Sequence, residues 1–167
     1  MLATLELRVD ESVRIERSFA SEVRRRQTAQ VFETKTLPVD VDRVAPDGAD
    51  VRALLQLAGG AVAYFELPAR ETSMAVRHRT VKEIWFFVSG RGQMWRRHGD
   101  REETVDVAPG VRVTIPLGTE FQFRSQGAEP LAAIAVTMPP WPGDGEAIRS
   151  VGPWEPTLPP GPGLAED

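Results

Sequence analysis

The stretch Val76-Arg-His-Arg-Thr-Val-Lys-Glu-Ile-Trp-Phe-Phe-Val-Ser-Gly90 indicates the fold of this chain more strongly than any other segment. Its second half is a run of aromatic and β-branched residues that ends at a serine and a glycine, which predicts a strand followed by a turn. Because side chains alternate along a strand, Glu83, Trp85 and Phe87 are expected to share one face. His78 lies just before this strand, five residues ahead of Glu83 in the sequence.

Short segments of the same kind lie on both sides of this stretch. The expected strands cover residues 51–57, 61–67, 83–88, 93–97, 104–107, 111–115, 121–124 and 131–137. They are separated by turn-forming residues such as Gly59-Gly60, Pro109-Gly110 and Pro116-Leu117-Gly118. Turn signals about every 8 to 12 residues predict an all-β sandwich or barrel.

The chain is expected to form one domain with a short extension at each end. Residues 1–50 are expected to form an N-terminal extension that packs on a barrel of residues 51–138, and residues 139–167 a C-terminal tail. The tail is rich in proline, glycine and tryptophan, and its composition predicts no regular element. Because disordered segments are poor in aromatic residues, the tail is expected to wrap across the barrel or onto a partner subunit.

The N-terminal extension has three patterned segments. Leu5, Leu7 and Val9 alternate with polar residues and predict a strand. Apolar residues recur every four positions from residue 15 to residue 23, which predicts a short amphipathic helix. Residues 32–37 alternate again, as in a strand, and stop at Pro38.

Composition excludes several classes of partner. The chain has 167 residues and a formal net charge of −4, whereas nucleic acids and anionic membranes require a basic surface. It has no cysteine, so disulfides and thiolate sites are excluded. Charges interrupt the first ten residues, which do not resemble a signal peptide, and no apolar run is long enough to span a bilayer. The chain is therefore expected to be cytoplasmic.

The central region resembles the cupin superfamily, a group of small jelly-roll barrels. Its first motif runs Gly, five residues, His-x-His, three or four residues, Glu, six residues, Gly, and here His78, Glu83 and Gly90 match it. The second motif contains Gly, five residues and Pro-x-Gly, which Gly110, Pro116 and Gly118 match. The resemblance implies a cupin-type double-stranded β-helix with an N-terminal strand and short-helix extension and a Pro-rich tail.

The resemblance also implies a divalent metal held by three histidines and a glutamate, but this chain keeps only half of that set. Val76 and Phe121 stand at the other two ligand positions and have no lone pair to donate. Catalytic zinc and non-haem iron sites need at least three protein ligands. No cofactor is therefore expected. The alternative is one Fe, Mn, Ni or Zn ion held by His78, Glu83 and Glu120, the last of which must turn inward against strand alternation.

Without a metal, His78 and Glu83 are candidate catalytic residues. A carboxylate can fix the tautomer of a histidine, and such a pair is a credible general acid or base. The other interpretation is a buried hydrogen-bonded pair with no catalytic role. Candidate substrate-binding residues are aromatic or apolar residues expected to face the barrel interior: Tyr64, Val76, Trp85, Phe87, Phe121 and Phe123. They would line an apolar pocket or simply fill the core.

Three function classes are compatible with these residues. The preferred one is a metal-independent cupin enzyme that catalyses proton transfer on a hydrophobic or aromatic small molecule, by isomerisation, epimerisation, dehydration or cyclisation. The first alternative is a non-catalytic small-molecule-binding cupin, and the second is a metal-dependent oxygenase or isomerase with a reduced ligand set. The resemblance also implies a homodimer, while a small-molecule ligand is the only other expected partner.

Overall fold

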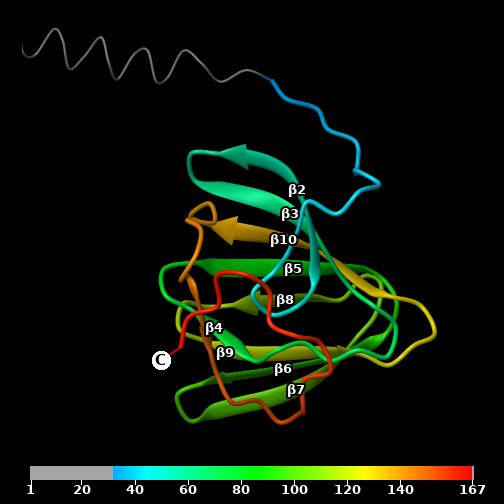
Figure 1. Cartoon of the computed structure of the whole chain (residues 1–167), viewed down its shortest axis with the longest axis vertical. Coiled ribbons are helices and arrows are strands. Elements are labelled where there is room, and N and C mark those ends of the chain that lie inside the picture. The colour runs from blue at the N-terminus through cyan, green and yellow to red at the C-terminus, as the bar shows by residue number, and fades with distance from the viewer. Residues whose placement is uncertain (1–31, 167) are drawn as a thin grey trace, which may run out of the picture. The chain divides into compact units, whose positions relative to one another are not determined.

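A computed structural model describes residues 32–166 of the chain (Figure 1). Contacts divide the chain into two units, Met1–Thr34 and Lys35–Asp167, and the strands of the described residues all lie in the second unit. The described residues form eleven strands and no helix, and so contain no helix long and apolar enough to cross a membrane. The strands are β1 (Arg43–Val44), β2 (Asp50–Leu57), β3 (Gly60–Leu67), β4 (Val76–His78), β5 (Lys82–Ser89), β6 (Gly92–His98), β7 (Arg101–Val107), β8 (Arg112–Ile115), β9 (Glu120–Ser125), β10 (Leu131–Met138) and β11 (Ala147–Arg149).

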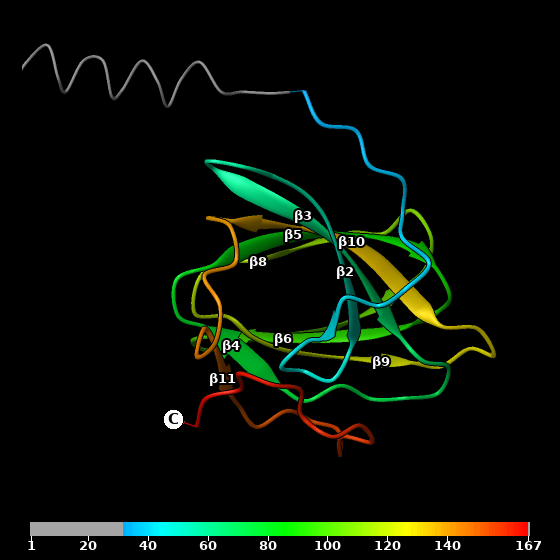
Figure 2. The ribbon, with the colours of Figure 1, turned by 45° about the horizontal axis from the view of Figure 1, so that its top comes forward.

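The strands form two antiparallel sheets that face each other (Figure 2). One sheet has the order β1-β2-β3-β10-β5-β8, and the other has the order β11-β4-β9-β6-β7. From β4 to β10 the chain crosses repeatedly between the sheets, which is the connectivity of a jelly roll. The fold is therefore all-β, as the sequence predicts.

The space between the sheets is filled by apolar side chains. Along β5, buried and exposed residues alternate strictly from Lys82 to Phe87, so one face of the strand packs inward. β9 adds Phe121 and Phe123 from the opposite sheet, and both are buried. The core thus takes aromatic rings from both sheets, and few polar groups share it.

All eight strands expected between residues 51 and 138 are present, as β2, β3 and β5–β10. Residues 32–37, which alternate like a strand, form none, because alternation alone provides no partner strand. The strand and the short helix expected within residues 1–31 lie outside the described residues. The expectation that the tail has no regular element is wrong at β11, where three residues between its prolines and glycines pair with β4.

The C-terminal tail is hydrogen-bonded to the barrel over much of its length. β11 pairs with β4, and the Trp154 backbone N–H and carbonyl both bond the side-chain amide of Gln122 on β9. The Trp154 ring also lies 4.3 Å from the Arg124 guanidinium. The tail therefore covers the outer face of the second sheet near β4 and β9.

Candidate functional site

The fold brings the four cupin ligand positions together. Val76 and His78 lie on β4, Glu83 on β5 and Phe121 on β9, and Val76 is the register partner of Phe121. The His78 Nδ1 atom lies 3.9 Å from Glu83 Oε2, and the His78 and Phe121 ring centroids are 5.2 Å apart. The four side chains are almost fully buried. The four side chains thus form one cluster, in which two members are apolar.

These residues do not fit a metal that needs three or more protein ligands. The third candidate ligand, Glu120, lies on the face of β9 opposite to Phe121 and forms an ion pair with Arg97. No bulge turns Glu120 inward, because β9 keeps regular register with β4 and β6. Across residues 32–166, no cluster of three His, Asp or Glu side chains has the arrangement of a metal site. Glu120 therefore cannot join His78 and Glu83 as a third ligand, and the expectation of that alternative ligand set is wrong.

His78 is enclosed by aromatic rings. Its imidazole meets the rings of Phe121 and Trp141 edge-on, at centroid distances of 5.2 and 5.1 Å. The buried Nδ1 atom has no hydrogen-bond partner in the described part of the chain, since 3.9 Å to Glu83 is too long for one. Burial lowers the pKa of His78 to about 4, and the Glu146 charge offsets only part of that effect. The imidazole is therefore neutral at pH 7.

Glu83 is buried deeper than His78 and is shifted in the opposite direction. Its Oε2 atom accepts a hydrogen bond of 2.9 Å from the Trp85 indole N–H. Burial raises the pKa of Glu83 to about 8; the Trp85 bond opposes this rise, and the charges of Asp47 and Glu146 add to it. Glu83 is therefore mostly protonated at pH 7, and the pair consists of a carboxylic acid and a neutral imidazole.

The aromatic residues proposed as a substrate pocket pack against one another. The Trp85 ring lies within about 6 Å of the rings of Phe87, Phe121 and Phe123, and it stacks on Phe65 at 5.1 Å. Each of these rings except Phe65 is almost fully buried. They therefore fill the core instead of leaving an open aromatic pocket.

Tyr64 does not join this group. It precedes Phe65 on β3, so its side chain lies on the outer face of the first sheet. There its hydroxyl lies 3.4 Å from Glu66 Oε2, and the Arg52 guanidinium lies over its ring. The expectation that Tyr64 faces the barrel interior and binds a substrate there is therefore wrong, because strand alternation turns it outward.

Three residues near the pair are not predicted by the sequence pattern. Trp141 and Glu146 come from the tail, and Asp47 from the turn after β1. Asp47 accepts a hydrogen bond from the Ala49 N–H, and burial raises its pKa to about 6. No motif marks these positions, because each reaches the pair through long-range packing.

Glu146 connects the tail to the β4–β5 turn. It accepts hydrogen bonds from the backbone N–H groups of Thr80 and Val81 at 2.7 and 2.8 Å, and from the Thr80 hydroxyl at 2.9 Å. Burial raises the pKa of Glu146, but these bonds outweigh it and the net pKa is lowered. Glu146 is therefore a charged residue that fixes the turn between His78 and Glu83.

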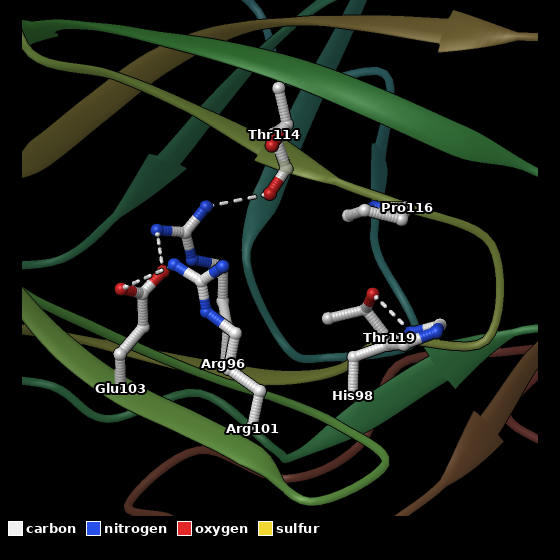
Figure 3. Close-up of a pocket in the computed structure, with 7 residues that line it drawn as sticks. All are labelled: Arg96, His98, Arg101, Glu103, Thr114, Pro116 and Thr119. Carbon is white, nitrogen blue, oxygen red and sulfur yellow. Dashed lines mark hydrogen bonds and ion pairs between the residues drawn. The ribbon is translucent and has the colours of Figure 1, made fainter.

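A separate pocket of about 400 Å³ lies where β6 and β7 of one sheet approach β8 of the other (Figure 3). We call it the seam pocket. Figure 3 shows three charged side chains at one wall and a histidine–threonine pair at the other, with the β8 segment above them. The lining residues are Arg96, His98, Arg101, Glu103, Thr114, Pro116 and Thr119.

Arg96 reaches the seam pocket because of strand register. Arg96 lies two residues beyond the buried Met94 and is the register partner of the buried Phe121. Its side chain is therefore on the inner face of β6, at the end of the barrel core. Its two Nη atoms donate to the Thr114 carbonyl at 2.7 Å and to Glu103 at 2.6 Å. Its buried Nε–H has no acceptor among the described residues. The register could have suggested this placement, but the sequence carries no motif for it.

His98 is exposed at the end of β6, as its turn sequence predicts, yet it also belongs to this pocket. Its Nδ1 atom lies 3.1 Å from the Thr119 hydroxyl oxygen, which anchors the imidazole to the β8–β9 turn. The His-Gly-Asp turn signature predicts only a solvent-exposed position for His98. Its contact with Thr119 depends on the pairing of β6 with β9, which a local pattern does not reveal.

Comparisons with known proteins show the fold. No protein-family model and no curated protein matches the sequence. Among solved structures, a cupin 2 conserved barrel domain protein from Salinispora arenicola has a TM-score of 0.53 at 18% identity, covering 65% of this chain and 89% of that one. A predicted oxalate decarboxylase from Thermotoga maritima has a TM-score of 0.51 at 15% identity, covering 62% and 98%. The Cnp3 cupin domain of Schizosaccharomyces pombe has a TM-score of 0.51 at 12% identity, covering 60% and 68%. These likenesses confirm the cupin fold.

Proposed function

We propose that this cupin-fold chain is a small-molecule-binding protein whose ligand occupies the seam pocket. One observation carries the proposal: the chain has an open pocket with charged and polar side chains where β6 and β7 approach β8, while the His78–Glu83 pair is packed against aromatic side chains. The pocket's volume of about 400 Å³ lies within the range of small-molecule sites, and its fixed polar groups can orient a bound molecule.

The contrast between the buried His78–Glu83 pair and the open seam pocket supports binding over catalysis. A proton-transfer catalyst must reach the reacting atom of its substrate within hydrogen-bond distance. His78 is only 6% exposed, and the Trp141 and Phe121 rings pack against its imidazole. A substrate could reach His78 only if these rings moved. A ligand can enter the seam pocket without such a movement, because Arg96, His98 and Thr119 already line it.

A thermal-shift screen of the full chain tests this proposal. The library contains anionic, neutral and cationic molecules of about 5 to 15 heavy atoms, which suits a pocket of this volume. At least one compound is expected to raise the melting temperature in a concentration-dependent way. That increase should disappear in Arg96→Gln and persist in Arg112→Gln. Arg112 lies on β8 outside the pocket, and its exposed guanidinium lies over the ring of Phe86 on β5. The proposal is contradicted if no compound raises the melting temperature, or if the increase persists in Arg96→Gln.

The second candidate function is the proton-transfer enzyme, and one observation favours it. The His78 Nδ1 atom is buried, has no partner in the described chain and lies 3.9 Å from a protonated Glu83. Pairs with opposite pKa shifts are concentrated at functional sites. In this candidate, Glu83 would donate a proton and the neutral His78 would accept one, after Trp141 has moved away.

Trp141→Ala separates the two candidates. Removing the indole opens space beside His78, so a catalyst working through His78 should then gain access for small molecules. The enzyme is favoured by compounds that raise the melting temperature of Trp141→Ala but not that of the double variant Trp141→Ala/His78→Gln. Compounds whose effect depends on Arg96 in both backgrounds favour the seam pocket.

A further inference from the structure

We infer that the ligand of the seam pocket is a small anion, recognised through a carboxylate or phosphate group. This inference rests on the proposed function. The pocket has two arginines and one glutamate, whose formal charges sum to +1, whereas the whole chain has a formal net charge of −4. A locally positive pocket on a negative protein favours anions over other solutes.

Arg96 is held in place before any ligand arrives. Its side chain is 15% exposed, and the Thr114 carbonyl and Glu103 fix its guanidinium. These two bonds use one N–H of each Nη atom and leave the second N–H of each for a ligand, whereas the Nε–H is buried and has no partner among the described residues. An arginine that is already ordered loses little side-chain entropy on binding and suits planar carboxylate or phosphate oxygens.

The opposite wall carries two polar side chains. The Thr119 hydroxyl oxygen and His98 Nδ1 are 3.1 Å apart, so the two groups orient each other. This contact leaves the other ring nitrogen of His98, Nε2, for a ligand. Together with Arg96, the pair places polar groups at two walls of a pocket of about 400 Å³.

Glu103 limits the affinity of the pocket for anions. Its carboxylate lies 2.6 Å from an Arg96 Nη atom and 3.8 Å from one of Arg101, so it competes with a bound anion for both cations. Removing this charge while keeping the side-chain shape should therefore strengthen anion binding. This expectation is specific, because a pocket for neutral or cationic ligands would respond in the opposite way or not at all.

Isothermal titration of the full chain with four probes tests the inference. The probes are succinate, inorganic phosphate, neutral succinamide and the cation putrescine, in a cationic buffer at low ionic strength, where charge effects are least screened. Succinate or phosphate is expected to bind at least tenfold more tightly than succinamide, the size of one charge-assisted hydrogen bond. The two anionic arms distinguish a carboxylate ligand from a phosphate ligand.

Three variants locate the effect. Arg96→Gln should weaken anion binding by about tenfold or more, and Glu103→Gln should strengthen it by about three- to tenfold. Arg112→Gln removes a cation from the same edge strand outside the pocket and should change the affinity less than about twofold. Equal binding of succinamide, or weaker anion binding in Glu103→Gln, overturns the inference. If a neutral or cationic compound from the screen depends on Arg96 while no anion binds, the proposed function stands and the inference fails.

Discussion

Replacing Glu83 with glutamine should stabilise the folded chain at neutral and alkaline pH. Glutamine keeps the size of the side chain and an oxygen that accepts the Trp85 indole bond, but it does not ionise. In the wild-type chain, burial raises the pKa of Glu83 from 4.5 to about 8. The folded state therefore holds this proton more tightly than the unfolded state does.

The sign and size of the effect follow from this difference. The stabilisation from protonated Glu83 is fully present below pH 4.5 and is lost as the pH rises through 8. A difference of roughly 3.5 pH units corresponds to about 5 kcal/mol above pH 8, and to about 3 kcal/mol at pH 7. Single domains have only about 5–15 kcal/mol of total stability, so an effect of this size is measurable.

Urea unfolding at pH 5, 7 and 9 measures the effect. The free energy of unfolding of Glu83→Gln should exceed that of the wild-type chain by about 3 kcal/mol at pH 7 and by more at pH 9, with a small difference at pH 5. Glu129→Gln, which removes an exposed carboxylate, is the matched control and should follow the wild-type profile.

A destabilised Glu83→Gln at pH 7 would refute the reasoning. That result would mean that Glu83 is ionised and pairs with a charged His78, because removing one partner of a buried ion pair typically costs about 3–5 kcal/mol. Parallel pH profiles for the variant and the wild-type chain would also refute it, since they would place the pKa of Glu83 near its ordinary value.

Three further predictions concern the same fold. Burial lowers the pKa of His78 from 6.5 to about 4, so the free energy of unfolding of the wild-type chain should fall by about 3 kcal/mol as the pH falls through this range. In urea unfolding at acid pH, His78→Gln should not show this decrease. Because only His78 and Glu83 remain at the cupin ligand positions, Fe, Mn, Ni and Zn salts should not raise the melting temperature, and stoichiometric metal in elemental analysis of the purified chain would contradict this expectation. The homodimer implied by the cupin resemblance is proposed to form through the outer face of the first sheet, where Ile84 and Phe86 are 45% and 41% exposed. Phe86→Lys should then shift the mass measured by light scattering from that of a dimer to that of a monomer. A monomeric wild-type chain would rule this dimer out.

The barrel was predictable because its signals are local. Alternating segments and turn residues placed all eight long strands, and the frame of Gly90, Gly110, Pro116 and Gly118 indicated the cupin fold. Strand alternation also favoured an outward Glu120, as the structure confirms. Period and turn chemistry determine these features over a few residues, so they are readable without tertiary information.

The surroundings of the site were not predictable in the same way. Trp141 covers His78 from a proline-rich tail, and Glu146 reaches the β4–β5 turn from 65 residues away in sequence. The orientation of Arg96 depends on its pairing with Phe121. Each of these placements results from contacts between distant segments, which composition and periodicity do not encode.

A crystal structure of the chain with its strongest screened ligand tests the central claim most directly. The ligand is expected between Arg96 and the His98–Thr119 pair, with the Trp141 ring still packed against His78. Ligand density beside His78, with Trp141 displaced from the barrel, would contradict the account and assign the function to the His78–Glu83 pair.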